Sequence, residues 1–299
     1  MQPLVQLVLL IVICVAVLLT WRSVKQGRAD LRGASRLTVF VFVCSMLDWL
    51  LTANHVPTGV EFISFVEGVS WALLIGTMVW CLYVALEPLV RKRWPESLVS
   101  WSQLLAGQLR HPLVGGHVLI GVAFGVAYAL LFSVPSIAGF EVAWDLTVLN
   151  SVADLPRMLD VFVRSLSQSV GLALGTFFFY FLLKSILRRE WLAAIVFALV
   201  FAVPAGLSTQ HFWINAFLTL VQFGLYIVIL TRFGLLPMVL SIAVEQDLRN
   251  FPLTTDFSIW YAGSTMFILA VVLVLTGYAV HTAVAGRPLV KEGLLESAS

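Results

Sequence analysis

The chain has 299 residues, of which 60% are hydrophobic and only 11% are charged, and its formal net charge at pH 7 is +2. Soluble domains carry about 25% charged residues, and a water-soluble fold of this length needs more polar side chains to cover its surface. The composition therefore excludes a disordered chain, a nucleic-acid-binding protein and an ordinary soluble enzyme. It predicts an all-α fold, a multi-pass bundle of membrane helices that forms one domain over residues 1–299.

Nine apolar stretches have about the 20 residues that a membrane-spanning helix needs. In chain order they cover 3–21, 37–54, 63–89, 113–134, 158–185, 191–209, 212–230, 234–250 and 260–283. The first resembles a signal peptide, but no Lys or Arg precedes it and basic residues follow it directly, which predicts an uncleaved helix with its N-terminus outside. The eighth is the shortest, because only Gly234 to Val244 is uncharged and largely apolar.

The distribution of basic residues tests this count. With the N-terminus outside, the inner segments are 22–36, 90–112, 184–190, 231–233 and 284–299. They hold all 18 Lys and Arg except Arg157, Arg164 and Arg249. Because cytoplasmic loops are enriched in Lys and Arg, this skew predicts nine crossings with the C-terminus inside, in a bacterial cytoplasmic (inner) membrane.

Two connecting segments carry patterns of their own. In 95–110, apolar residues recur at helical spacing after Pro95, which predicts an amphipathic helix on the inner face, with Trp101 turned towards lipid or protein and Gln103 towards water. In the outer connection, residues 142–152 predict a second interfacial piece.

No motif for chemistry is present. The sequence has no GxGxxG, Walker, HExxH or GxSxG pattern, and its three cysteines and five histidines fall in separate segments. We therefore expect no metal, no cofactor and no catalytic residues.

Ionisable residues within the apolar stretches are the main functional hint, because charge is costly at membrane depth. Asp160 and Arg164 are four residues apart on one helix and can pair, and Glu245 must face protein or water because its helix is short. These residues predict a polar cavity open to the outer side. Structural ion pairs, a ligand pocket and catalysis all remain open for this set. Its members are Asp48, Asp160, Arg164, Gln168, Glu245, Asp247 and Arg249.

A basic inner face is also predicted, and it could bind a cytoplasmic protein partner or anionic lipid. It comprises Arg22, Arg28, Arg32, Arg91, Lys92 and Arg93. The GxxxG pairs at Gly121/Gly125 and Gly171/Gly175 allow close helix approach, either within the bundle or in a homodimer. The expected partners are thus the lipid bilayer, a cytoplasmic protein or anionic lipid at the inner face, and a second copy of the chain. No nucleic acid is expected.

Several short segments resemble the membrane-embedded C-terminal region of bacterial serine/threonine protein kinases of the acidobacterial type. The resemblance covers most of the chain. Its segments are 27–34, 85–95 (ALEPLVRKRWP), 101–107, 111–115, 232–236, 251–254, 260–262 and 286–288. No kinase domain is present, so the resemblance implies a membrane module without kinase activity.

A second resemblance covers 171–250, which is similar to a degenerate core of the CAAX-protease and bacteriocin-processing family of intramembrane peptidases. Where that family has its Glu pair and Arg, this chain has Gly175-Thr176 and Tyr180. Its FxxxH position holds Phe201 and Ala205, and its HxxxN position holds Ile242 and Gln246. The resemblance implies a relative without the catalytic set.

Three functions follow as expectations. The first is a non-enzymatic sensory or scaffolding module of a kinase-associated signalling system. The second is a transporter or lipid-handling protein that uses the polar cavity. The third is an intramembrane peptidase, against which the missing catalytic residues argue.

Overall fold

The computed structural model describes residues 2–53, 55, 58–137, 146–207 and 211–284, without the side chains of 2–9, 136–137 and 146. These residues form helices and short connections and contain no strand. The helices are α1 (Gln2–Lys25), α2 (Leu31–Thr52), α3 (Gly59–Arg93), the 3₁₀ turn η1 (Pro95–Leu98), α4 (Val99–Leu105), α5 (Pro112–Ile137), α6 (Leu146–Ala153), α7 (Leu155–Leu187), α8 (Glu190–Leu207), α9 (Phe212–Arg232), α10 (Leu235–Asn250) and α11 (Ala262–Val284). The expected all-α fold is confirmed for this part of the chain.

Seven of the described helices are long and apolar enough to cross a membrane, namely α2, α3, α5, α7, α8, α9 and α11. The chain is therefore a multi-pass membrane protein. Two of the nine expected spans are not in this set. One is α10, whose 16 residues give a length of about 24 Å, short of a hydrocarbon core of about 30 Å. The other is α1.

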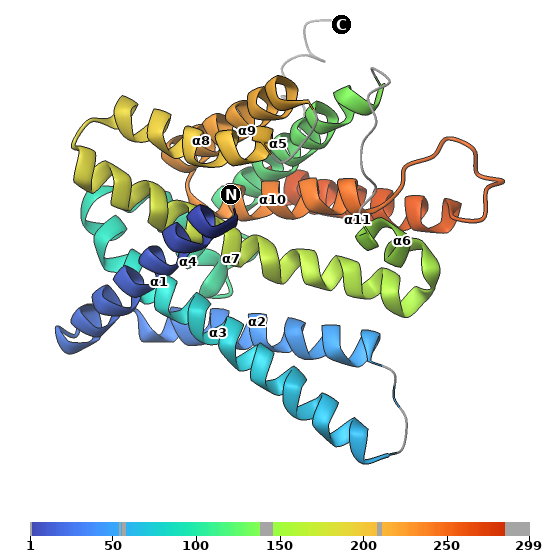
Figure 1. Cartoon of the computed structure of the whole chain (residues 1–299), viewed down its shortest axis with the longest axis horizontal. Coiled ribbons are helices and arrows are strands. Elements are labelled where there is room, and N and C mark those ends of the chain that lie inside the picture. Colours follow the sequence, from blue (N-terminus) through green and yellow to red (C-terminus); the bar gives the residue numbers. More distant parts are fainter. Residues whose placement is uncertain (1, 54, 56–57, 138–145, 208–210, 285–299) are drawn as a thin grey trace, which may run out of the picture.

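The basic ends of the helices meet around the segment between α3 and α5 (Figure 1). Arg36, near the start of α2, donates to the backbone O of Leu105 at 2.5 Å, and the Tyr278 hydroxyl in α11 donates to the backbone O of Leu109 at 2.5 Å. The ammonium of Lys184, near the end of α7, lies 3.9 Å from the centre of the Trp94 ring. The turn from α2 to α3 and the connection from α10 to α11 lie at the opposite end, on the right of Figure 1. We call these the basic end and the far end.

The segment 95–110 is less regular than its pattern predicts. Pro95 opens a 3₁₀ turn instead of an α-helix, and the helix that follows ends at Leu105. Trp101 is buried within the protein, as one expected alternative had it, whereas Leu109 is 50% exposed. Gln103 is only partly exposed, and its side-chain oxygen is buried and unpaired among the described residues, so the expectation that it faces water is met only in part. The segment thus packs into the basic end of the bundle. Of the expected outer interfacial piece, α6 covers 146–153, and 142–145 lie outside the described residues.

Glycines let α10 lie directly on α5. A Cβ added at Gly121 would lie 2.7 Å from the Cβ of Leu240, and one added at Gly125 would lie 2.7 Å from the Cβ of Val244. These contacts are too short for any side chain, so the first predicted GxxxG pair serves packing within the chain. The second pair does not, because nothing lies within 4 Å of a Cβ at Gly175.

The helices α2, α3 and α7 form the part of the bundle that matters for the candidate site. Their starts are fixed locally: the carboxylate of Asp30 accepts from the backbone N–H of Gly33 at 3.0 Å, and the carboxylate of Asp154 accepts from the backbone N–H of Arg157 at 2.8 Å. In Figure 1, α2 and α7 run side by side, while α3 crosses α2 and diverges from α7 towards the far end. This divergence leaves room between the three helices.

Candidate functional site

A groove of about 670 Å³ lies between α2, α3 and α7 in their far-end halves. Its lining residues recur at intervals of three and four along each helix, so each helix contributes one face. On α2 they are Ser45, Asp48, Trp49 and Thr52; on α3 they are Ser64, Glu67, Gly68, Trp71 and Ile75; on α7 they are Arg164, Ser167, Gln168, Gly171 and Leu172. Carboxylate, guanidinium, amide, hydroxyl and indole groups thus share one concave surface.

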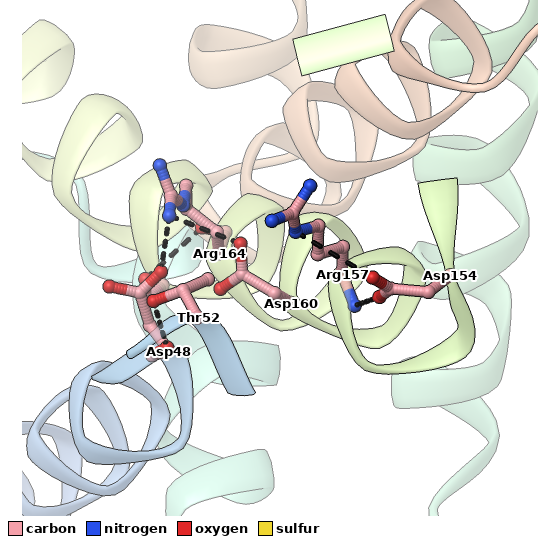
Figure 2. Close-up of polar contacts among 7 residues, drawn as sticks. Asp48, Thr52, Asp154, Arg157, Asp160 and Arg164 are labelled. Atoms are coloured by element: carbon pink, nitrogen blue, oxygen red, sulfur yellow. Dashed lines mark hydrogen bonds and ion pairs between the residues drawn. The ribbon is translucent and has the colours of Figure 1, made fainter. Parts of the chain in front are cut away.

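An ion-pair triad joins two walls of this groove (Figure 2). The guanidinium of Arg164 in α7 donates both to the carboxylate of Asp48 in α2 and, at 3.1 Å, to that of Asp160 one turn earlier in α7. The side chain of Asp160 is only 3% exposed, whereas those of Asp48 and Arg164 are 34% and 43% exposed. Asp160 therefore supports Arg164 from the protein side, and Asp48 and Arg164 face the groove.

The indole of Trp49 is held in place within the groove wall. Its Nε1 donates to the Ser64 hydroxyl at 3.0 Å, and its ring meets the rings of His55 and Phe65 edge-on at 5.2 and 5.4 Å. A Cβ added at Gly68 would lie 2.7 Å from the Trp49 ring, so only glycine lets the indole lie against α3. Trp71 by contrast is 64% exposed, at the open side of the groove.

Glu67 is the one carboxylate of the groove without a partner. Within the described part of the chain its side chain makes no hydrogen bond or ion pair, and it lies exposed on an apolar helix. The groove and its support thus hold three carboxylates, those of Glu67, Asp48 and Asp160, and one cation, Arg164. The groove therefore carries an excess of negative charge.

The predicted polar cavity is divided into separate groups. Asp48, Arg164 and Gln168 line the groove, and Asp160 supports it, but α7 separates them from the residues of α10. Ser165 of α7 faces α10 and not α2, and its hydroxyl donates a hydrogen bond to the carboxylate of Asp247 at 2.5 Å. Asp247 is buried. Asp247 also borders an apolar cavity of about 640 Å³ between α7, α10 and α11.

Glu245 and Arg249 form the remaining group. They pair at 2.8 Å across one turn of α10, and the guanidinium of Arg249 lies 4.8 Å from the centre of the Phe132 ring. The side chain of Glu245 is 4% exposed, so it faces protein as expected. Neither residue lines the groove.

The predicted basic inner face gathers at the basic end. Its members lie at the end of α1, in the connection to α2, at the start of α2 and at the end of α3, and all are exposed. Arg91 pairs with Glu87 at 2.7 Å, and the guanidinium of Arg93 lies 5.3 Å from the centre of the Phe181 ring. The other members, Arg22, Arg28, Arg32 and Lys92, are exposed cations on the same end of the bundle.

His55, between α2 and α3, bridges the two helices at the far end. Its Nδ1 lies 2.6 Å from the Glu61 carboxylate and its Nε2 lies 2.9 Å from the backbone O of Leu50. Both ring nitrogens face acceptors, so only the protonated ring satisfies both. The hydrogen bond to Glu61, followed by the one to Leu50, raises the pKa of His55 above its ordinary value.

Three of the positions where the peptidase resemblance expects catalytic residues, Tyr180, Phe201 and Ile242, lie in apolar packing. Phe201 stacks on Phe223 with ring centres 4.1 Å apart, Tyr180 meets Phe197 at 5.7 Å, and Ile242 is buried. Among the described residues, no three of the His, Cys, Asp and Glu side chains come together as a metal site would require.

Sequence reasoning missed Glu67 and the two tryptophans of the groove. Their signal was present in α3, where Ser64, Glu67 and Trp71 share one helical face with a glycine. That stretch is otherwise apolar on all sides, so its polar face is a single carboxylate and a hydroxyl. This face of α3 becomes part of a groove only because α2 and α7 pack beside it, and a single sequence does not show that packing.

Comparisons of the chain with protein-family models, with curated proteins and with solved structures find no match. The fold and the groove define a multi-pass membrane protein with a polar groove between three of its helices.

Proposed function

We propose that the chain is a non-enzymatic sensory module of the bacterial inner membrane, which binds a ligand in the groove between α2, α3 and α7. The observation that carries this proposal is the Arg164 triad, because it ties α2 to α7 at the surface that a ligand would touch. A ligand that competes for Asp48 or Arg164 would change how the two helices are held together.

The helices of the groove continue to the basic end, which is what a sensory module needs. The lengths of α3 and α7 are 35 and 33 residues, or about 50 Å each. A small rotation or shift at the groove therefore moves residues such as Arg93 and Lys184 at the opposite end. That basic end could bind a cytoplasmic kinase or another protein partner, in keeping with the kinase-region resemblance.

Packing below the groove favours sensing over transport. At the basic end, beyond the groove, Trp94 stacks on Phe177 and Tyr180 with ring centres 6.2 and 6.3 Å apart. Val79 in α3 and Leu174 in α7 are also buried. A transported solute would have to displace this packed layer.

The membrane topology belongs to the same proposal. Nine crossings, with α1 and the short α10 added to the seven longer apolar helices, place the basic end in the cytoplasm and the groove in the outer half of the membrane. The gathering of the helix ends that carry Lys and Arg around the segment between α3 and α5 supports this arrangement.

Spin labels at the basic end test the proposal. In a chain with Cys14, Cys44 and Cys81 replaced by Ala, labels at Arg32→Cys in α2 and Ser185→Cys in α7 report the distance between the two helices. Adding Asp48→Asn weakens the triad at the far end, and we expect the distance to shift by about 2 Å.

The matched control is Arg157→Gln, which removes an exposed ion pair at the start of α7. It should leave the label distance unchanged. An unchanged distance in the Asp48→Asn protein, or an equal shift in the control, would contradict coupling between the groove and the basic end.

A further inference from the structure

We infer that the ligand of this groove is an amphiphile with a positively charged ammonium headgroup. This inference names the ligand class of the site and rests on the proposed function. Three independent features of the groove carry it: its charge, its aromatic surfaces and its open side.

The charge of the groove selects a cation. Arg164 is already neutralised by Asp48 and supported by Asp160, so it does not offer an uncompensated positive charge to an anionic ligand. Glu67 stands on the facing helix without a partner in the described residues, on a helix that is otherwise apolar there. An unpaired carboxylate is costly at membrane depth, and a bound ammonium group would lower that cost.

The aromatic surfaces select the same chemistry. Trp49 and Trp71 line the groove together with Glu67, and indole is the side chain that binds cations best through its ring face. The position of Trp49 is fixed before any ligand arrives, because Ser64, Phe65 and His55 hold its ring. Little ordering is then needed on binding.

The open side of the groove indicates an apolar chain attached to the headgroup. Next to Trp71, the exposed side chains of α3 include the apolar Val66 and Leu74, the Ser70 hydroxyl donates to the backbone O of Val66, and Leu172 of α7 is 51% exposed. Such surfaces on membrane-spanning helices contact lipid. A ligand can therefore place its ammonium beside Glu67 and keep its alkyl chain in the bilayer.

Two sources share this chemistry: a membrane lipid such as phosphatidylethanolamine, and a free amphiphilic amine. Native mass spectrometry of the full chain in detergent, titrated with phosphatidylethanolamine, phosphatidylglycerol or dodecyltrimethylammonium, distinguishes them. Tetramethylammonium, which has no alkyl chain, is the fourth probe. We expect dodecyltrimethylammonium to bind and tetramethylammonium not to bind; retention of phosphatidylethanolamine as well identifies the lipid as the source.

Variants assign the binding to the groove. Glu67→Gln should weaken binding of dodecyltrimethylammonium by about tenfold, which corresponds to the loss of one charge-assisted contact. Trp71→Leu should weaken it less, by about threefold. Glu96→Gln, an exposed carboxylate at the basic end, is the control and should leave binding unchanged.

Preference for phosphatidylglycerol, or equal binding of dodecyltrimethylammonium by the parent and the Glu67→Gln protein, would overturn the inference. The proposed function fails separately, through the label distances. If the distance between the spin labels changes with Asp48→Asn but the protein does not bind the ammonium probes, the proposed sensory function stands and this ligand class is wrong.

Discussion

At the scale of single residues, the triad of Arg164 explains how an apolar bundle tolerates several charges. Asp160 is buried and Asp48 is one-third exposed, and both carboxylates accept hydrogen bonds from the one guanidinium of Arg164. Pairing within a helix turn was visible in the spacing of Asp160 and Arg164. The contact with Asp48, 116 residues away in the sequence, was not, because nothing in a single sequence places α2 beside α7.

Replacing Arg164 should destabilise the protein more than replacing its neighbour Arg157. Arg164→Leu leaves the buried Asp160 and the half-buried Asp48 without a cation, and we expect a loss of about 1–3 kcal/mol in the free energy of unfolding. Arg157 belongs to a pair that is 3.7 Å apart and half exposed, which contributes about 0–1 kcal/mol. Thermal unfolding in detergent measures both, and equal melting temperatures would contradict the role of the triad.

His55 should make the far end sensitive to pH. Because its pKa is raised in the folded protein, the stabilisation it provides is complete below its ordinary value of 6.5 and is lost as the pH rises through the raised value. The melting temperature of the parent should therefore exceed that of His55→Ala by more at pH 5.5 than at pH 9, where only the contact of the ring with Trp49 remains. His281→Ala, at the end of α11, is the control. A difference that grows with pH would contradict the bridge between Glu61 and Leu50.

At the scale of helices, periodicity predicted the apolar elements well because lipid imposes length and composition on each span. The bounds of α5, α9 and α10 lie within a few residues of the predicted apolar stretches. Prediction failed in 95–110, where the pattern of Leu98, Trp101 and Leu104 indicated one amphipathic helix. There Trp101 packs into the helix bundle and not onto a flat membrane surface. The segment is therefore divided into a 3₁₀ turn and a short helix that follow the neighbouring helices.

Substitution of Gly125 should disrupt the contact between α5 and α10. In the Gly125→Leu protein a side chain would have to enter the space of Val244 and of the backbone O of Ser241, and we expect a loss of about 1–3 kcal/mol. Gly175→Leu, in α7, is matched in chemistry and meets open space, so it should cost less than about 0.5 kcal/mol. Melting temperatures in the same detergent compare them, and equal losses would argue against close α5–α10 packing.

At the scale of the whole molecule, one network of buried side chains reaches from Ala16 in α1 to Ala279 in α11. Hydropathy indicated such a bundle, and the basic loops indicated which helix ends lie together. The groove was only half predicted: the sequence pointed to charged residues in α2 and α7 but also grouped them with Glu245 and Arg249. The position of α7 between the two groups separates them, and that is a property of packing alone.

The topology has a direct consequence for fusions. If the basic end faces the cytoplasm, green fluorescent protein fused after Ser299 should fluoresce, and alkaline phosphatase at the same place should be inactive. Fusions after Phe257, in the connection from α10 to α11, should give the reverse result. An active phosphatase after Ser299 would contradict the nine-crossing arrangement.

Above all, we propose that the groove between α2, α3 and α7 holds a ligand beside the Arg164 triad. A high-resolution cryo-electron microscopy map of the full chain, in nanodiscs that contain phosphatidylethanolamine, tests it most directly. We expect headgroup density between Glu67 and Asp48, next to Trp71, and its loss in the Glu67→Gln protein. A map in which side chains fill the groove, or in which the density is the same in both proteins, would contradict it.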